Sequence, residues 1–79
     1  MKQKKYFNLE LKKIFKKELK LNIKKDNKIH DFIQWDSLAN FNILLACEKK
    51  FNIKFSSQEF SRASSFKEIL KIIEKKIKK

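Results

Sequence analysis

The 79-residue chain contains neither glycine nor proline. These two residues make most tight turns and hairpins, because Gly adopts positive φ without steric cost and Pro presets φ for a turn. Lys, Leu, Glu, Ile and Phe recur instead at intervals of three and four residues, which is the period of an amphipathic helix. We therefore predict an all-α fold in a single domain over residues 1–79, a small four-helix bundle with three longer helices and one short helix.

Two helices and a long loop are predicted before the last third of the chain. The first helix runs from about residue 5 to about residue 20, with the apolar stripe Phe7, Leu11, Ile14, Phe15 and Leu19. Residues 22–36 lose this period, so we expect a loop packed onto the helices. Its apolar residues should be covered: Ile23, Ile29, Phe32 and Ile33. The second helix starts at Ser37 and ends near Phe51, after Asp36, whose charge suits the positive end of a helix dipole.

Capping residues predict the last two helices. Ser56 and Glu59 have the S-x-x-E spacing of a capping box, which predicts a brief helix through about Arg62. Ser65 and Glu68 repeat this spacing and open the last helix. The apolar stripe of that helix consists of Phe66, Ile69, Leu70, Ile73 and Ile77.

The size and cysteine content leave hydrophobic packing as the source of stability. A domain of this length buries only about 60–65% of the surface of its unfolded chain. The one cysteine cannot form an internal disulfide, and no Cys/His spacing indicates a structural metal. No apolar run approaches the roughly 20 residues of a membrane span, and no signal peptide follows the N-terminal lysines. We expect a cytoplasmic monomer that does not insert into membranes.

The net charge of +12 raises the question of nucleic-acid binding. Arg62 is the only arginine. The guanidinium group, which forms paired hydrogen bonds with guanine edges and phosphates, is therefore nearly absent. The lysines spread over the first helix, the loop and the C-terminus, and the excess of Lys, Ile, Asn and Phe is typical of an AT-rich genome. We interpret the charge as a solvated basic face and expect no nucleic-acid partner. A small basic helical module that binds protein or nucleic acid without a cofactor is the alternative.

Few residues of this chain suit catalysis. His30 is the only histidine, and a nucleophile pair with Ser37 would lack both an orienting third group and a Gly-rich oxyanion turn. We expect a non-enzymatic protein in which His30 is a loop residue. Cys47 lies on the core stripe of the second helix and is interpreted as a small buried hydrophobe, and Trp35 as a packing residue.

The second helix carries two apolar stripes. One consists of Ile43, Leu44, Cys47 and Phe51, and the other of Leu38, Phe41 and Leu45, which continues along the helix from Ser37. Both stripes could be buried, the second one under the loop. Alternatively, the second is a docking strip beside a modifiable serine. The Ser37 hydroxyl is suited to a phosphodiester, because the first turn of a helix offers unpaired N–H groups and positive dipole character.

Several of these segments together resemble an acyl carrier protein, a stand-alone carrier of the phosphopantetheine-binding family. The resemblance covers about residues 5–77. It depends on Trp35-Asp36-Ser37-Leu38, the apolar helix ending Glu48-Lys49-Lys50-Phe51, Ile53-Lys54-Phe55, and the closing Ser65-Phe66…Ile69-Leu70 pattern.

The resemblance implies that a separate phosphopantetheinyl transferase, using coenzyme A and Mg²⁺, esterifies Ser37 with 4′-phosphopantetheine. The terminal thiol of this arm then carries an acyl or aminoacyl thioester. An acyl-loading ligase or synthase and acyl-transferring enzymes are the further partners that it implies. Asp36 would help the transferase to recognise the serine. Residues Leu38, Phe41 and Leu45 would face partners, whereas Ile43, Cys47 and Phe51 would line the acyl-accepting core.

Two features depart from the carriers of fatty acid synthesis. Those carriers are acidic along the second helix, whereas here Glu48 is outnumbered by Lys49 and Lys50. Trp35 also stands where they commonly have a small residue. Because electrostatic complementarity selects partners, we expect a specialised pathway whose enzymes present acidic or mainly apolar docking surfaces.

Overall fold

The computed structural model describes residues 2–77, with side chains described for residues 5–77. This part of the chain folds into four helices. They are α1 (Lys2–Leu19), α2 (Ser37–Phe51), α3 (Ser57–Arg62) and α4 (Phe66–Ile77). This confirms the predicted all-α fold with three longer helices and one short helix. Residues 1, 78 and 79 of the predicted domain lie outside the described range.

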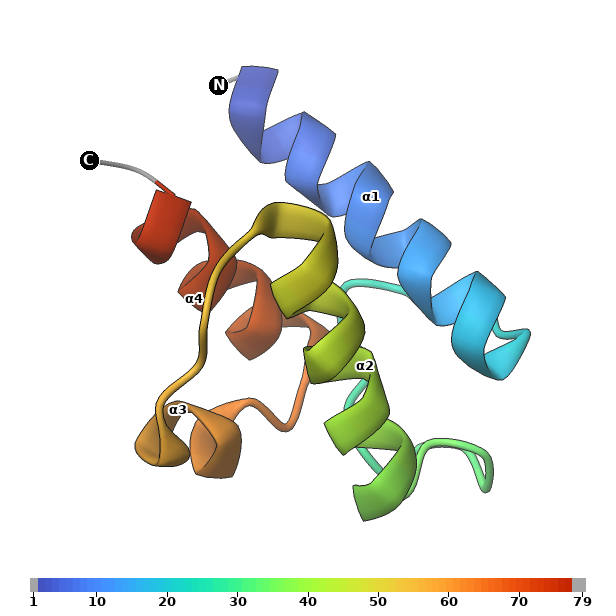
Figure 1. The fold of residues 1–79 in the computed structure, drawn as a ribbon. Helices are drawn as coiled ribbons and strands as arrows, with labels where there is room; N and C mark the ends of the chain where they lie inside the picture. The colour runs from blue at the N-terminus through green and yellow to red at the C-terminus, as the bar shows by residue number, and fades with distance from the viewer. Residues whose placement is uncertain (1, 78–79) are drawn as a thin grey trace.

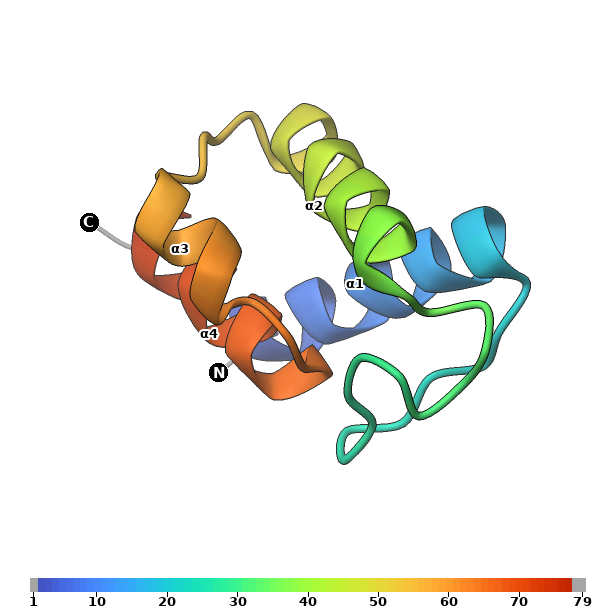
Figure 2. The same cartoon turned by 90° about the horizontal axis from the view of Figure 1, so that it is seen from below.

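The three longer helices pack against one another. α1 contacts both α2 and α4, and α2 also contacts α4. Figure 1 shows that α1 and α2 run in roughly opposite directions, while α3 lies apart from α1 on the other side of the bundle (Figures 1 and 2). The start of α2 is therefore bordered by the long loop on one side and by α3 on the other.

The core is made mainly by the predicted stripes together with the loop before α2, although Leu19, Phe51, Leu70 and Ile77 of the stripes are only partly buried. Three buried hydrophobic residues of the described chain lie outside both: Phe55, Ala63 and Ile72. Phe15 of α1 is fully buried and contacts Trp35 edge-on, with ring centroids 4.7 Å apart, and Phe66 of α4 at 6.0 Å. Trp35 is 0% exposed, so its interpretation as a packing residue is confirmed. One aromatic cluster thus joins α1, the loop and α4.

The long loop, residues 20–36, is attached to the segment between α3 and α4 by backbone hydrogen bonds. The Ile29 N–H donates to the Ser64 carbonyl at 2.8 Å, and the Phe66 N–H donates to the Asn27 carbonyl at 3.1 Å. Ile23 is buried, and Ile29 and Phe32 are partly buried, as predicted. The expected cover over Ile33 is wrong, because this side chain is 95% exposed.

The helix ends show how a chain without glycine makes its turns. Within residues 2–77, three residues take positive φ: Lys20, His30 and Asn52. Asn52 is the C-cap of α2, and its N–H donates to the Glu48 carbonyl. Asn tolerates the left-handed region better than most residues with a Cβ, so it replaces the usual glycine at this helix end.

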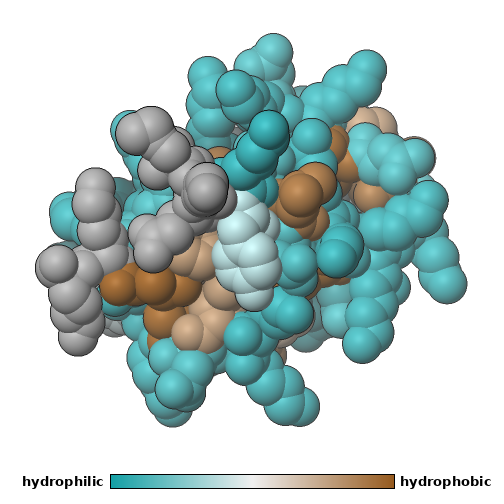
Figure 3. Space-filling model, turned by 90° about the horizontal axis from the view of Figure 1, so that it is seen from above, coloured by the Kyte–Doolittle hydropathy of each residue, from teal (hydrophilic) through white to brown (hydrophobic). Residues whose placement is uncertain are grey.

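The face seen from above is mostly hydrophilic, with apolar residues gathered in a few areas between hydrophilic side chains (Figure 3). Over the described part of the chain, we find no helix that combines the length and the apolar character needed to cross a membrane.

Candidate functional site

Ser37 is the first residue of α2, and its side chain is exposed to solvent. The preceding Asp36 is the N-cap, with extended backbone, and its Oδ1 accepts a hydrogen bond from the Ala39 N–H at 2.9 Å. Asp36 therefore starts the helix by satisfying one of its free N–H groups. Part of the positive character of this helix end is used by the Asp36 carboxylate and is not free for a phosphodiester on Ser37.

The segment that carries Ser37 is held by a buried network of hydrogen bonds. The Trp35 Nε1–H donates to Asn40 Oδ1 at 2.9 Å, and the Asn40 Nδ2–H donates to the Ala63 carbonyl at 2.7 Å. The His30 N–H donates to the Trp35 carbonyl at 2.8 Å. The residues on both sides of Ser37 are thus fixed to the loop, to α2 and to the end of α3.

Asn40 is the residue that sequence reasoning missed. It is the one buried polar side chain among the residues described here, with 7% exposure. A signal was present, because asparagine favours caps and turns over helix interiors and is rarely buried without partners. Its place inside the apolar second helix, five residues after the tryptophan, could have indicated a structural amide.

The two apolar stripes of α2 have different surroundings. The first is buried at Ile43, Leu44 and Cys47, each at most 1% exposed. The second is exposed: Leu38 at 69%, Phe41 at 46% and Leu45 at 41%. The alternative in which both stripes are buried is therefore excluded. We call Leu38, Phe41 and Leu45 the exposed strip; its role in docking stays a prediction.

A small pocket of about 230 Å³ lies beside Ser37, between α2, α3 and the loop. The Phe41 ring on one wall packs against Phe60 of α3, with ring centroids 5.3 Å apart, and Phe60 also contacts Phe55 at 5.7 Å. Ser61 and Ser64 also line it, and the Ser61 hydroxyl donates to the Ser57 carbonyl at 3.3 Å. The pocket thus combines aromatic side chains with three serine residues.

The remaining candidates for chemistry receive little support from the geometry. Among the described side chains, no hydrogen bond joins His30 to Ser37, and no group of His, Cys, Asp and Glu could hold a metal ion. Cys47 is buried, as predicted, and this burial raises the pKa of its thiol to about 12. A thiol with this pKa is a poor nucleophile near neutral pH.

Comparisons of the chain with protein-family models, with curated proteins and with solved structures found no match.

Proposed function

We propose that this chain is an acyl or aminoacyl carrier of the cytoplasm that takes 4′-phosphopantetheine on Ser37. The observation that carries the proposal is the position of this serine: exposed, first in its helix, and followed by the exposed strip. Its partners are a phosphopantetheinyl transferase, an acyl-loading ligase or synthase, and acyl-transferring enzymes. The chain itself is not an enzyme.

The described residues fit such a group. An enzyme that modifies Ser37 must reach its Oγ, and this side chain is open to solvent. The Trp35 and Asn40 hydrogen bonds attach the residues on both sides of it to the core, which supports a fixed position for the start of the helix. When attached, the group supplies a thiol that holds the cargo as a thioester. Ser37 provides the point of attachment, and the pocket with Phe41 and Phe60 offers apolar cover next to it.

The closed core limits how cargo is protected. In the inward stripe of α2, Ile43, Leu44 and Cys47 are fully buried and Phe51 is partly buried. The pocket beside Ser37 has a volume of only about 230 Å³. A long apolar chain would enter the bundle only if the helices separated, which costs packing energy in a core of native density. A short or polar cargo, or shelter of the cargo by the partner enzyme, therefore fits this chain best.

Mass spectrometry after enzymatic modification tests the proposal. The purified chain is incubated with a broad-specificity phosphopantetheinyl transferase, Mg²⁺ and coenzyme A, and its intact mass is recorded. We expect the addition of one phosphopantetheine, with release of adenosine 3′,5′-bisphosphate. The Ser37→Ala variant should gain nothing.

Ser57 offers a matched control, because it is also exposed and is also the first residue of a helix, after the N-cap Ser56. The Ser57→Ala variant should be modified as fully as the unchanged chain. Absence of modification with several transferases would overturn the carrier proposal. The exposed strip would then favour the second candidate, a helical protein-interaction module that takes no cofactor.

A further inference from the structure

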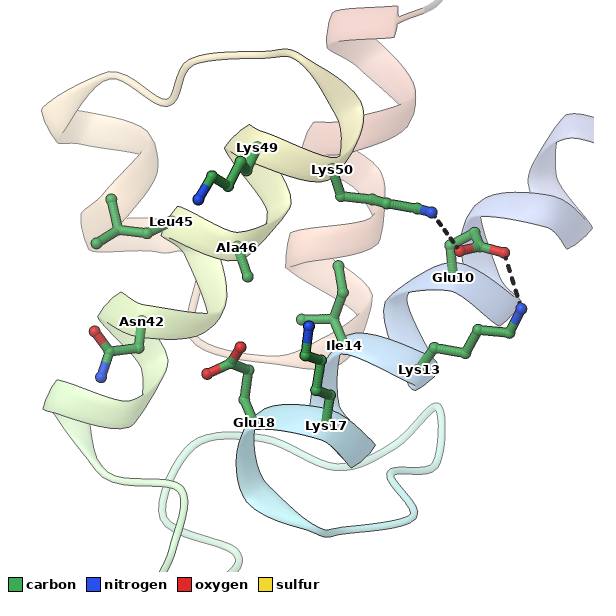
Figure 4. A pocket seen from close by; sticks show the side chains of 10 residues that line it. All are labelled: Glu10, Lys13, Ile14, Lys17, Glu18, Asn42, Leu45, Ala46, Lys49 and Lys50. Atoms are coloured by element: carbon green, nitrogen blue, oxygen red, sulfur yellow. Dashed lines mark hydrogen bonds and ion pairs between the residues drawn. The ribbon is translucent and has the colours of Figure 1, made fainter.

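A groove of about 600 Å³ runs between α1 and α2, next to the exposed strip. Its apolar lining includes Ile14 of α1 and Ala46 of α2, with Leu45 at the edge, where its side chain points away from α1 (Figure 4). Figure 4 shows charged side chains along both walls, with Lys17 and Glu18 reaching from α1 toward α2. Leu45 belongs to the groove and to the exposed strip, so the two surfaces are continuous.

One wall of the groove is fixed by a shared carboxylate. Glu10 forms ion pairs with Lys50 at 3.1 Å and with Lys13 at 3.3 Å, and the Lys50 pair joins α1 to the end of α2 (Figure 4). The interaction with Lys50, and to a smaller extent that with Lys13, holds the pKa of Glu10 below its ordinary value. The Glu10 carboxylate in turn raises the pKa of Lys50. The Glu10 side chain is only 14% exposed, whereas that of Lys13 is 73% exposed. The lysines therefore remain accessible from solvent.

The groove as a whole is positive. Four lysines and two glutamates line it, so its formal charge is +2. Lys17 and Lys49 stand on opposite walls, and neither makes an ion pair with another residue of the described chain. A ligand that places carboxylates at these two positions would gain two charge-assisted contacts without breaking an existing pair.

The mixed lining distinguishes between possible anionic ligands. A nucleic acid presents evenly spaced phosphates, so it cannot place neutral groups opposite the Glu10 and Glu18 carboxylates in this groove, as a peptide can. It would also leave the apolar lining without a matching surface. An amphipathic helix with acidic flanks can bury its apolar stripe on Leu45 and Ala46 and pair its carboxylates with the lysines. The groove lining therefore favours a protein partner.

We propose that the α1/α2 groove is the docking site for an acidic amphipathic helix of an enzyme that acts on the Ser37 arm. The identity of the partner as such an enzyme rests on the proposed carrier function; the binding itself does not. Leu45 lies eight residues after Ser37, about 12 Å along the helix axis at 1.5 Å per residue. A helix seated in the groove would thus leave the serine free while contacting the strip that leads to it.

Binding of a synthetic peptide tests this proposal. The probe is an amphipathic helix of about 18 residues with a leucine stripe flanked by glutamates, long enough to hold helical structure. It is titrated into the ¹⁵N-labelled full chain, and amide shifts are followed by NMR. We expect the largest shifts at Lys13, Lys17, Leu45 and Lys49, with binding that weakens as salt increases. A peptide with the same stripe flanked by lysines should not bind.

Paired charge reversals locate the site. The variant Lys17→Glu/Lys49→Glu should weaken binding of the acidic peptide by about tenfold or more, equivalent to at least about 1.4 kcal/mol. Its matched control is Lys12→Glu/Lys71→Glu, which makes the same change of net charge in a different groove, between α1 and α4. The control should bind within about twofold of the unchanged chain. Urea unfolding of both variants verifies that they are folded.

Three outcomes would overturn the proposal: equal weakening in both double variants, shifts confined to another face, or tighter binding of a single-stranded oligonucleotide or anionic vesicles at the same residues. The titration is done on the unmodified chain and repeated with Ser37→Ala. If Ser37 cannot be modified but the peptide binds, the carrier proposal and the identity of the partner as a carrier enzyme fail, and the docking of an acidic helix in the groove stands. If Ser37 is modified but the peptide does not bind, only the groove proposal fails.

Discussion

The indole N–H of Trp35 donates a hydrogen bond of 2.9 Å to Asn40 Oδ1, entirely within the core. This bond crosses the start of α2 and joins the loop on one side of Ser37 to the helix on the other. Because the Asn40 amide also donates to the Ala63 carbonyl at 2.7 Å, a single side chain connects the loop before α2, α2 itself and the end of α3, which lies 23 residues further along the chain. The position of the helix start that carries the exposed serine therefore depends on a buried amide.

Replacing Asn40 should be costly. Asn40→Ala leaves the Trp35 indole N–H and the Ala63 carbonyl without their partners, and we expect a loss of about 2–3 kcal/mol in the free energy of unfolding. Urea unfolding followed by fluorescence of the single tryptophan measures it. Asn42→Ala is the matched control, because Asn42 is exposed on the same helix and should change stability by less than about 0.5 kcal/mol. Equal losses in the two variants would contradict a structural role for the network.

Two neighbouring leucines should respond differently to the same substitution. Leu44 is 1% exposed and Leu45 is 41% exposed. Leu44→Ala leaves a cavity in the core and should cost about 2–5 kcal/mol, whereas Leu45→Ala should cost less than about 1 kcal/mol. Urea midpoints of both variants test this. A large loss for Leu45→Ala would mean that the exposed strip is part of the core and is not available to partners.

Two substitutions of Asp36 distinguish its role as the N-cap of α2 from its proposed role in recognition by the transferase. Asp36→Ala removes the acceptor for the Ala39 N–H and should cost about 1 kcal/mol, while Asp36→Asn retains a capping oxygen and should cost little. The rate at which a transferase modifies Ser37 is measured for both variants. If the charge itself is recognised, Asp36→Asn will be as stable as the unchanged chain and yet modified more slowly. Equal rates for Asp36→Asn and the unchanged chain would assign Asp36 to capping alone.

Glu59 should make stability depend on acidic pH. The hydrogen bond from the Ser56 N–H, together with the Lys76 ion pair at 2.9 Å, holds the pKa of Glu59 below its ordinary value of 4.5. Since the folded-state pKa is lowered, this carboxylate stabilises the fold above pH 4.5, and the contribution is lost as pH falls through the lowered value.

Urea midpoints measured from neutral pH to about pH 3 test the Glu59 prediction. The urea midpoint of the unchanged chain should decrease as the pH is lowered beyond 4.5, and the midpoint of Glu59→Gln should decrease less steeply. Glutamine keeps the hydrogen-bonding capacity needed for the capping box but does not titrate. Parallel pH profiles for the two proteins would show that Glu59 contributes nothing to acid sensitivity.

Cys47 should be protected from alkylation in the folded chain. Burial raises the pKa of its thiol to about 12, and only the thiolate reacts readily. With iodoacetamide at mildly alkaline pH, intact mass should show almost no alkylation under native conditions and complete alkylation in urea. Alkylation of the native chain at the rate of a free cysteine would mean that α2 detaches from the core frequently, and that the bundle opens more easily than its packing indicates.

The helix starts could be predicted because their signals are local. Asp36 and Ser56 each lie next to the N–H groups that they cap, so neighbouring residues are enough to identify them. The buried stripes followed from the helical period in the same way. Ile33 was misjudged because its hydrophobicity says nothing about whether a loop residue will find a surface to cover it.

The sequence by itself determined the all-α class, the order of the helices and the position of Ser37 at a helix start, since each depends on residues close together in the chain. Only the tertiary structure decided that the strip from Leu38 to Leu45 is exposed, that Asn40 is buried, and that lysines of α1 and α2 share one groove. These features depend on which helix faces lie together. That choice is made by the packing of the whole core, to which residues far apart in sequence contribute at once.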